Sequence, residues 1–442
     1  MKLFARSANL GPKSARVRPV FGFILLLTVF EAGVVYWVNS TPPPANSTAL
    51  VRPTVRPTPP ARPGAVLGQD AVEHFTPAET AALIRHNYPA GVPGEGIGVT
   101  KITFHYRTQL PDGQMTTIYG RAYLPDNGQG NLPIFAFGPG TTGIGDECAA
   151  SLEKPAVANW GSYDSHMSAY AVQGYAAVTT DYEGMRDTQR VHHYMVGELE
   201  GRALLDAVRG LRQLTQSKGR LSPDSIFLSG YSQGGHAAFW ADKIADRYAP
   251  DVRPLGVVGF GPVMSVKQTL ADVTHGANIN WFGPNVLRSY TDYYKQTYPG
   301  VILPARELNL AANVDSHCID TDLSYWGHTP AAIYTPEFIQ SSLADDISTQ
   351  YPQFGKALDD NEVGAVSTSS AKRINQGAND NVVLPAQQAV AIPKLCASST
   401  GPVQLVVYPG TTHYTAMLRS FGDTIAWMRA VADHQTVPST CS

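Results

Sequence analysis

The segment SIFLSGYSQGGHAAFWADKIADRY, at residues 225–248, constrains the fold more than any other part of the sequence. A strand-like apolar run is followed by a glycine-rich turn, which holds Ser232, and then by a helical pattern. A tight strand-to-helix turn of this kind needs glycine two positions before and after the serine, because a side chain there would collide with the adjacent strand or helix. Gly230 and Gly234 occupy those positions. The segment therefore indicates a nucleophilic serine at the end of a strand, in a sheet covered by helices.

Apolar runs alternate with helical patterns from about residue 70 onward, which is typical of a mostly parallel sheet with helices on its faces. Strands are expected at residues 132–138, 175–181, 225–230, 255–261 and 403–410. Apolar residues recur at helical spacing in residues 204–214, directly after Ser232, and in residues 417–431. We predict a single α/β catalytic domain over residues 67–442.

The alternation stops between residues 264 and 366, where the chain is rich in Tyr, Asn and Asp and carries Trp281 and Trp326. This stretch is longer than an ordinary connection between a strand and a helix. We predict that residues 264–366 form an inserted, mainly helical lid or cap domain.

The N-terminal region has the pattern of an export or anchor signal. Basic residues are scattered over residues 1–19, and residues 20–38 form an apolar run long enough to span a bilayer. The run is longer than the core of a cleaved signal peptide and ends at Tyr36-Trp37, which favours a transmembrane anchor, whereas Glu31 inside it favours a cleaved signal. In both cases the basic flank keeps the N-terminus in the cytoplasm and places the body outside. The proline-rich residues 39–66 are expected to be a semi-rigid linker.

Charge and cysteine content narrow the class of partner and the compartment. Beyond residue 63 the chain has 25 Lys and Arg against 35 Asp and Glu, and an acidic body argues against nucleic acid as a partner. Four cysteines remain: Cys148, Cys318, Cys396 and Cys441. In an exported chain an even number favours disulfides over metal binding, with reduced core thiols as the alternative. The sequence alone permits three pairings, and it contains no zinc-type cluster of His and Cys.

A nucleophilic serine needs a histidine to accept its proton and a carboxylate to orient that histidine. After Ser232, Asp380 lies in the loop that follows a strand, and His413 lies where the last strand meets the last helix. The separation of 33 positions between them leaves room for a helix and a strand. We predict the triad Ser232, Asp380 and His413. The rival carboxylates in the same interval are Asp322, Asp359 and Asp360.

The tetrahedral intermediate of such a reaction needs two preorganised N–H donors. One is expected from Gln233, which follows the nucleophile, and the other from Thr142, in the glycine-rich turn after the strand at residues 132–138. His236 is interpreted as a packing residue or as one that supports the site from behind it. His192, His193, His317 and His328 are interpreted as ordinary loop residues.

Five ordered motifs, spread over roughly residues 70–435, resemble those of the secretory lipase family, the lipase A-like group of α/β-hydrolases. They are GPGTTGIGDECAA, VTTDYEGM with HHYMVGELEGRALLDAVRGLR, GYSQGGHAAFWA, QGANDNVV and YPGTTHYTAM. The resemblance implies an α/β-hydrolase fold, with Ser232 as nucleophile, Asp380 as acid, His413 as base and the amides of Thr142 and Gln233 as oxyanion hole. It also implies disulfides Cys148–Cys318 and Cys396–Cys441 and a helical lid at residues 264–366.

The sequence departs from the family at two places. Gly184-Met185-Arg186 stands where relatives tend to have Gly-Leu-Gly, and His192-His193-Tyr194 stands where they tend to have His-Pro-Tyr. Both changes are expected at the pocket rim and away from the triad. The cap region is also more polar than a surface built to rest on oil, which favours ester hydrolysis in general over long-chain lipase activity in particular.

The sequence predicts an exported serine hydrolase that cleaves carboxylic esters or lipids through an acyl-enzyme, without metal or organic cofactor. It is expected outside the cytoplasm, attached to the membrane through residues 20–38. Two alternatives stay open on the sequence alone. One is an acyltransferase or amidase that uses the same triad, and the other is a non-catalytic hydrolase fold acting as a binding module of the cell envelope.

Overall fold

The computed structural model describes residues 62–128, 130–154, 160–216, 221–276 and 279–441. The chain divides into two compact units, Met1–Pro57 and Thr58–Ser442, and all of these residues belong to the second. The predicted basic segment 1–19, the predicted span 20–38 and most of the predicted linker 39–66 lie outside the described residues. In the part of the chain that the structure describes, no helix combines the length and the apolarity needed to cross a membrane.

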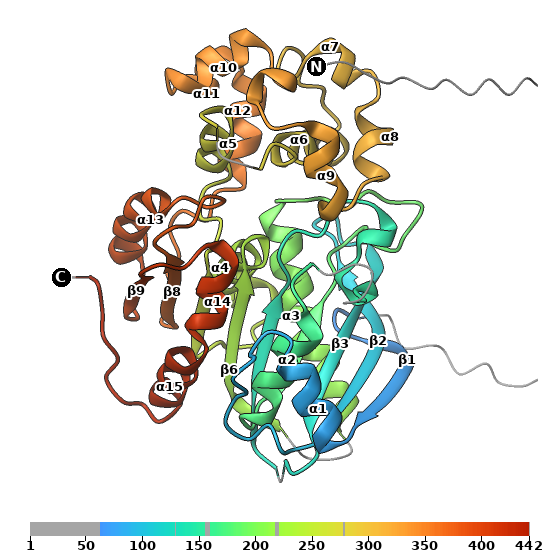
Figure 1. Ribbon diagram of the computed structural model, residues 1–442, viewed down its shortest axis with the longest axis vertical. Coiled ribbons are helices and arrows are strands. Elements are labelled where there is room, and N and C mark those ends of the chain that lie inside the picture. Colours follow the sequence, from blue (N-terminus) through green and yellow to red (C-terminus); the bar gives the residue numbers. More distant parts are fainter. Residues whose placement is uncertain (1–61, 129, 155–159, 217–220, 277–278, 442) are drawn as a thin grey trace, which may run out of the picture. The chain divides into compact units, whose positions relative to one another are not determined.

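The described residues form one nine-stranded sheet (Figure 1), in the order β1-β2-β3-β5-β4-β6-β7-β8-β9. The pairings that involve β1, β2 and β3 are antiparallel, whereas every pairing from β5 to β9 in that order is parallel. The predicted mostly parallel sheet is confirmed. The strands are β1 (Val66–Phe75), β2 (Val99–Gln109), β3 (Met115–Pro125), β4 (Leu132–Gly138), β5 (Ala176–Thr180), β6 (Leu221–Tyr231), β7 (Gly256–Phe260), β8 (Ala371–Gly377) and β9 (Val403–Tyr408).

Helices cover both faces of the sheet because its central strands are apolar on both sides. In β4, Ile134 and Ala136 point into one buried cluster, while Phe135 and Phe137 point into another. This is the period-two alternation of a strand. The first cluster packs against α3 (Gly197–Thr215), α4 (Gln233–Tyr248) and α13 (Pro385–Ser398), and the second against α1 (Pro77–Ile84), α2 (Tyr163–Val172), α14 (His413–Arg419) and α15 (Phe421–Ala432).

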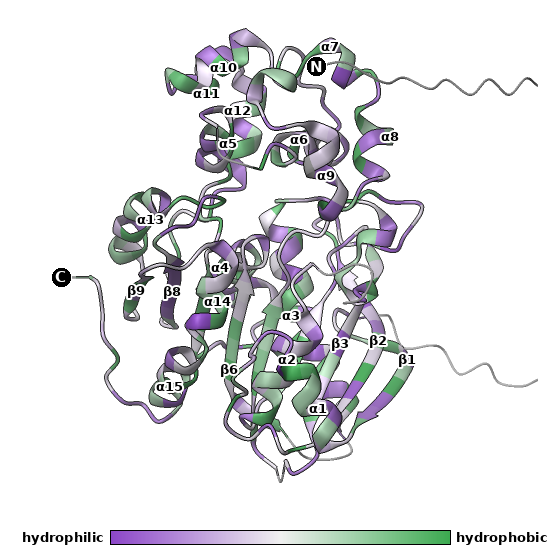
Figure 2. Cartoon of the chain, viewed as in Figure 1, coloured by the Kyte–Doolittle hydropathy of each residue, from purple (hydrophilic) through white to green (hydrophobic). Residues whose placement is uncertain are grey.

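The outer strands have a different character from the central ones. Figure 2 shows purple interspersed with green along β1 and β2. Lys101 of β2 and Arg121 of β3 are nonetheless buried, because both pair with Asp164 of α2, at 3.0 and 2.8 Å. Because polar residues interrupt β1, β2 and β3, these strands contain no long apolar run. The sequence pattern therefore does not predict them.

The region between β7 and β8 consists of helices, gathered at the top of Figure 1. They are α5 (Val266–Thr274), α6 (Phe282–Tyr294), α7 (Pro304–Glu307), α8 (Leu310–Asp315), α9 (Ile319–Trp326), α10 (Pro336–Leu343), α11 (Ile347–Gln350) and α12 (Pro352–Asp360). Short 3₁₀ helices lie at Pro330–Ala332 in this region and at Asp146–Cys148 and Ala150–Leu152 in the body. Trp326, Tyr290 and Phe338 of this region belong to a buried hydrophobic cluster that also includes residues outside it, such as Tyr194 and Leu199. We call residues 264–366 the cap and the rest of the described chain the body.

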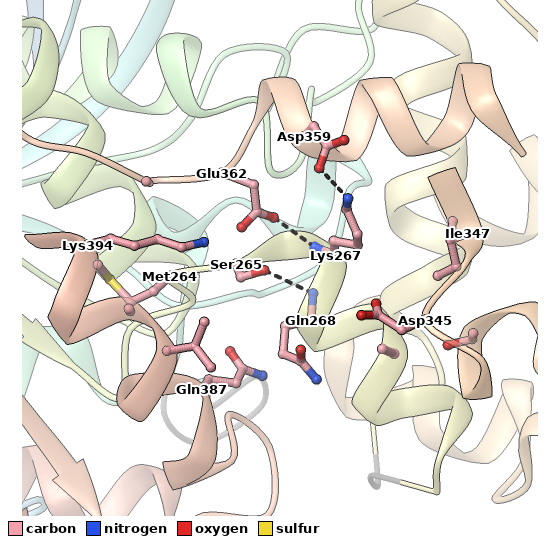
Figure 3. Close-up of a pocket in the computed structure, with 15 residues that line it drawn as sticks. Met264, Ser265, Lys267, Gln268, Asp345, Ile347, Asp359, Glu362, Gln387 and Lys394 are labelled. Carbon is pink, nitrogen blue, oxygen red and sulfur yellow. Dashed lines mark hydrogen bonds and ion pairs between the residues drawn. The ribbon is translucent and has the colours of Figure 1, made fainter. Parts of the chain in front are cut away.

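The segments through which the chain enters and leaves the cap contact each other (Figure 3). The backbone amide of Lys267 donates to Glu362 Oε1 at 3.0 Å, and the Lys267 ammonium pairs with Asp359. A cavity of about 210 Å³ lies beside these contacts and is also lined by Gln387 and Lys394 of α13. Burial raises the pKa of the Glu362 carboxyl. The entry and exit of the cap are therefore held together beside a cavity that α13 of the body also lines.

Two disulfides are present, Cys148–Cys318 and Cys396–Cys441. This is the pairing that the family resemblance implies. The first joins the loop after β4 to the start of α9 and so links body to cap, whereas the second joins α13 to the C-terminal segment within the body. Disulfides are typical of proteins that fold in an oxidising compartment.

Candidate active site

Ser232 lies on a sharp turn between β6 and α4 and has a left-handed backbone, with φ of 55°. The turn is so tight that neighbouring backbones leave no room for side chains. A Cβ on Gly230 would lie 1.9 Å from the carbonyl oxygen of Gly234, and one on Gly234 would lie 1.8 Å from that of Gly138. The two glycines singled out in the sequence are therefore required by close backbone approach. Strain held at one serine by rigid surroundings is typical of a nucleophile presented to a substrate.

His413 begins α14, directly after β9, and its Nδ1 lies 2.7 Å from Asp380 Oδ2. Asp380 is itself held by the amides of Val382 and Val383, each 2.9 Å from Oδ1, and by Gln376 Nε2, 2.9 Å from Oδ2. Because these donors fix the carboxylate, Nδ1 of His413 is the nitrogen that carries hydrogen, and Nε2 is left as the basic nitrogen.

His413 lies next to the serine turn. Its ring is 4.8 Å from the ring of Tyr231, the residue before Ser232, and a Cβ on Gly261 would lie 2.9 Å from His413 Nδ1. Nε2 is buried and has no hydrogen-bond partner among the described residues. Ser232, Asp380 and His413 are thus gathered at the carboxyl ends of β6, β8 and β9, with a buried basic nitrogen left unpaired.

The rival carboxylates lie elsewhere. Asp322, in α9, accepts from Trp326 Nε1 at 3.2 Å, and burial raises its pKa to about 7. Asp359 pairs with Lys267, and Asp360 pairs with Lys356 at 2.7 Å. All three belong to the cap, and the carboxylate bonded to His413 is Asp380.

The loop after β4 carries Thr142 and is tied to the cap. The carbonyl of Thr142 accepts from the Ile319 amide at 3.0 Å, and Gly143 pairs with Cys318 as an isolated β-bridge, beside the disulfide. On the body side, Thr141 Oγ1 is 2.9 Å from the Tyr194 hydroxyl. The loop expected to supply one oxyanion donor is therefore held from two sides. Gln233, expected to supply the other, is the first residue of α4.

A buried carboxylate outside the predicted set of site residues lies behind Gln233. Glu200 Oε1 accepts from Gln233 Nε2 at 2.7 Å, and Glu200 Oε2 lies 2.7 Å from His236 Nδ1. His236 therefore supports the site from behind it, which was one of its two expected roles. A signal for Glu200 exists in the sequence. It falls on the apolar stripe of α3, at helical spacing before Leu204 and Leu211, where a charge is costly unless it is paired.

The two departures from the family motifs differ in their consequence. Met185 is buried in the body core, and Arg186 lies over the ring of Tyr119 at 3.6 Å, so neither contacts the triad. His192 contacts the site, since its Nε2 lies 3.1 Å from Gln233 Nε2. His193 bridges the body and the cap, with Nδ1 2.7 Å from Glu183 Oε2 and Nε2 3.0 Å from Asp292 Oδ2 of α6. Neither histidine is the ordinary loop residue that was expected.

Within the described ranges, no group of three or more His, Cys, Asp or Glu side chains is arranged to hold a metal ion. What the residues around Ser232 offer is a strained serine, a buried imidazole oriented by a carboxylate, and helix α4, whose N-terminus begins at the residue after the serine. These parts suit nucleophilic acyl transfer.

Comparison with known proteins shows that the chain is similar to lipases. The family model described as Secretory lipase matches residues 162–438 of the chain. Lipase A of Moesziomyces aphidis is 30% identical over 131 residues, which are 30% of this chain and 25% of that protein. Lipase 1 of Candida albicans is 30% identical over 160 residues, which are 35% of this chain and 32% of that protein. The chain thus spans about a quarter to a third of the length of the curated relatives it matches.

Solved structures show the same fold. The rice cell wall degrading esterase LipA from Xanthomonas oryzae, in a ligand-bound form, matches with a TM-score of 0.69 and 20% identity, over 85% of this chain and 100% of that one. Candida antarctica lipase A in its closed state matches with a TM-score of 0.63 and 19% identity, over 86% of this chain and 85% of that one. At such identities the likeness concerns the fold alone, and it confirms the predicted α/β-hydrolase fold.

Proposed function

We propose, from the premise that this chain belongs to the secretory lipase family, that it hydrolyses carboxylic esters with Ser232, His413 and Asp380 as its triad. The observation that carries the proposal is the 2.7 Å contact between His413 Nδ1 and Asp380 Oδ2, with His413 Nε2 buried and unpaired beside the strained serine turn. An ester or lipid is the substrate class that the family membership supports.

The geometry supports a two-step mechanism. His413 Nε2 accepts the Ser232 hydroxyl proton as Oγ attacks the ester carbonyl, and Asp380 stabilises the imidazolium that forms. The amides of Gln233 and Thr142 donate to the oxyanion. His413 then gives the proton to the leaving alcohol, which leaves an acyl-enzyme on Ser232. A water molecule, deprotonated by the same histidine, releases the acid and restores the serine.

The cap is proposed to set which esters reach Ser232. It is fastened to the oxyanion loop by the Cys148–Cys318 disulfide and by the hydrogen bond from Ile319 to Thr142. Any movement of α9 is thereby transmitted to the loop that holds Thr142. We further propose that the protein acts outside the cytoplasm and is anchored by residues 20–38. Family membership and the two disulfides support export, and the basic flank and apolar length of the sequence support the anchor.

The test is release of nitrophenol from p-nitrophenyl esters of increasing acyl length by the full-length chain, beside Ser232→Ala. We expect turnover by the wild type and none by the variant. Ser229→Ala is the matched control. Ser229 is a buried serine of β6, the strand that leads to Ser232, and its hydroxyl donates to the Ala136 carbonyl at 2.9 Å. It should keep its activity and lose about 1 kcal/mol of stability.

Three outcomes would contradict the proposal or narrow it. No turnover by the wild type at any acyl length would sink the esterase function. Turnover unchanged in Ser232→Ala would sink the assignment of the nucleophile. Transfer of the acyl group to an added alcohol, faster than its release to water, would make the protein an acyltransferase on the same triad.

A further inference from the structure

The strongest cluster of charged side chains outside the triad lies between α3 and α4. Glu200 and His236 are both fully buried, with side chains 1% and 0% exposed. A buried charge is costly unless it is paired and hydrogen-bonded. Removing one partner of such a pair is strongly destabilising. Because burying the pair is costly in itself, its presence between α3 and α4 calls for a functional or structural reason.

Both ring nitrogens of His236 lie within hydrogen-bond distance of an oxygen atom. His236 Nδ1 lies 2.7 Å from Glu200 Oε2, and His236 Nε2 lies 2.8 Å from the backbone carbonyl of Asn361. A carboxylate and a carbonyl can only accept hydrogen bonds. With Glu200 ionised, both ring nitrogens of His236 carry hydrogen, and the pair consists of an imidazolium and a carboxylate.

The other oxygen of Glu200 faces the proposed oxyanion site. Oε1 accepts from the Gln233 side-chain amide at 2.7 Å and from the backbone amide of Met195 at 3.0 Å. Gln233 supplies one expected oxyanion donor through its backbone. Met195 follows Tyr194, whose hydroxyl lies 2.9 Å from Thr141 Oγ1 in the loop of the other donor. One carboxylate oxygen thus connects the two halves of the oxyanion site.

The same network reaches the end of the cap. Asn361 follows α12, and its side chain accepts from the Gly197 amide at 3.0 Å and donates to the Tyr294 hydroxyl of α6 at 2.8 Å. Its carbonyl also accepts from Trp240 Nε1 at 3.3 Å. The chain of contacts from Gln233 through Glu200 and His236 to Asn361 is therefore continuous.

We propose that Glu200 is a positioning residue for ester hydrolysis. Its carboxylate holds Gln233 and the Met195–Tyr194 segment in the geometry of the oxyanion hole. His236 neutralises its charge and ties it to the cap. This inference rests on the proposed function, because it assumes that the amides of Gln233 and Thr142 stabilise the oxyanion. Glu200 does not touch the reacting atoms.

Charge balance explains why a carboxylate can serve here. A lone anion behind Gln233 would oppose the negative charge that develops on the substrate oxygen. The His236 imidazolium cancels it at a distance of one hydrogen bond. Glu200→Gln tests this point, because its amide oxygen can still accept from Gln233 and Met195. Its NH₂ can donate to His236 Nδ1 once that ring is neutral, with Nε2–H still donating to Asn361.

The experiment measures kcat and KM for p-nitrophenyl butanoate in the full-length protein, together with the rate at which diethyl p-nitrophenyl phosphate labels Ser232. In the labelling step Ser232 Oγ bonds to phosphorus, p-nitrophenolate leaves, and the phosphoryl oxygen occupies the oxyanion hole. For Glu200→Ala we expect a fall of roughly 10- to 100-fold in kcat and in the labelling rate, the scale for a displaced catalytic group, with KM within about twofold. Glu200→Gln should restore both rates to within about threefold of the wild type.

The matched control is Asp206→Ala. Asp206 lies on the same helix and is fully buried, and it also accepts three hydrogen bonds, from Thr108, Tyr248 and Arg209. Its loss should lower the melting temperature as Glu200→Ala does, without the fall in kcat. A fall in kcat of equal size in both variants would overturn the positioning role.

Gln233→Met tests the same contact from the other side and serves if Glu200→Ala does not fold. It keeps the backbone amide and removes the side-chain donor, so we expect the same fall in kcat, and no further fall when it is combined with Glu200→Ala. Wild-type kcat in either single variant would overturn the inference. An inactive wild type would instead overturn the proposed function, so the two failures are distinguishable.

Discussion

Two buried histidine–carboxylate pairs lie in the body, and their first contacts are the same. His413 Nδ1 is 2.7 Å from Asp380, and His236 Nδ1 is 2.7 Å from Glu200. They differ at the second nitrogen. Nε2 of His413 has no hydrogen-bond partner among the described residues, whereas Nε2 of His236 donates to the Asn361 carbonyl at 2.8 Å. One ring nitrogen of the first histidine is therefore open to a substrate, whereas both nitrogens of the second are occupied by protein oxygens.

The elements that carry the two pairs explain this difference. His413 and Asp380 lie in loops at the carboxyl ends of β9 and β8, where a parallel sheet leaves side chains room to meet a ligand. Glu200 and His236 lie on α3 and α4, which pack against each other, so each polar atom is met by a protein atom. In the proposed mechanism the same pair of residue types thus provides a base in one place and rigidity in the other.

The largest effect expected from this comparison separates the two histidines. His413→Gln removes the base and should lower kcat by about 10⁴-fold or more. His236→Gln removes the counter-ion of Glu200, so it should lower the free energy of unfolding by about 3 kcal/mol and lower kcat far less, by about 10-fold, through the uncompensated charge behind Gln233. Ester turnover and denaturant unfolding of both variants measure this. Comparable losses of kcat would break the comparison.

The next effect separates the two carboxylates by the same chemical change. Asp380→Asn can no longer hold the Nδ1–H tautomer of His413, and kcat should fall by about 10⁴-fold. Glu200→Gln keeps its hydrogen bonds, because His236 can lose its charge, and kcat should stay within about threefold. Initial rates under identical conditions decide the matter. A large loss in Glu200→Gln would show that the charge of the second pair is itself needed.

The first pair and the second pair also differ in how far the sequence predicts them. Ser232, Asp380 and His413 each follow an apolar strand run or stand in a short glycine-rich motif, and the order of the three is fixed by the fold. The local sequence pattern is therefore enough to predict these three residues. Glu200 and His236 are 36 residues apart in the sequence and lie on different helices. Only the packing of α3 on α4 brings them together. Single-sequence periodicity places both on buried faces without pairing them.

Strands with buried polar residues were missed for a related reason. β8, with the sequence AKRINQG, is fully buried although it has no apolar run. The side chain of its Lys372 is fully buried, and the Lys372 ammonium lies 3.4 Å from Asp242 Oδ2 of α4. The helical spacing over residues 417–431 belongs to two helices, α14 and α15, which are separated at Ser420. The Ser420 hydroxyl donates to the Met417 carbonyl at 3.1 Å. Such local competition for backbone groups is not visible in hydrophobic spacing.

A third histidine extends the comparison and gives the smallest of the expected effects. His193 also has both nitrogens on acceptors, Glu183 of the body and Asp292 of the cap, but it lies near the surface with its side chain 11% exposed. Burial alone would lower its pKa, but the hydrogen bonds to Glu183 and then Asp292 outweigh burial and raise it. Arg190 also pairs with Glu183, at 3.3 Å, and Lys295 with Asp292, at 3.2 Å.

The sign of the pH dependence follows from the raised pKa. The stabilisation is fully present below the unfolded pKa of about 6.5 and is lost as the pH rises through the higher pKa of the folded protein. We expect the wild type to lose on the order of 1 kcal/mol of this stabilisation between pH 6 and pH 9, and His193→Gln to lose none. Denaturant unfolding at both pH values measures it, and limited proteolysis of the cap follows the same change.

His328→Gln, which replaces an exposed cap histidine, is the control and should behave as the wild type. If His193→Gln keeps the full pH dependence, the bridge between Glu183 and Asp292 does not hold the cap. A dependence that vanishes only in His193→Gln would show that a histidine with both nitrogens bonded still titrates when water reaches it. Burial, and not only the number of partners, would then distinguish the fully buried pair at His236 from the titrating bridge at His193.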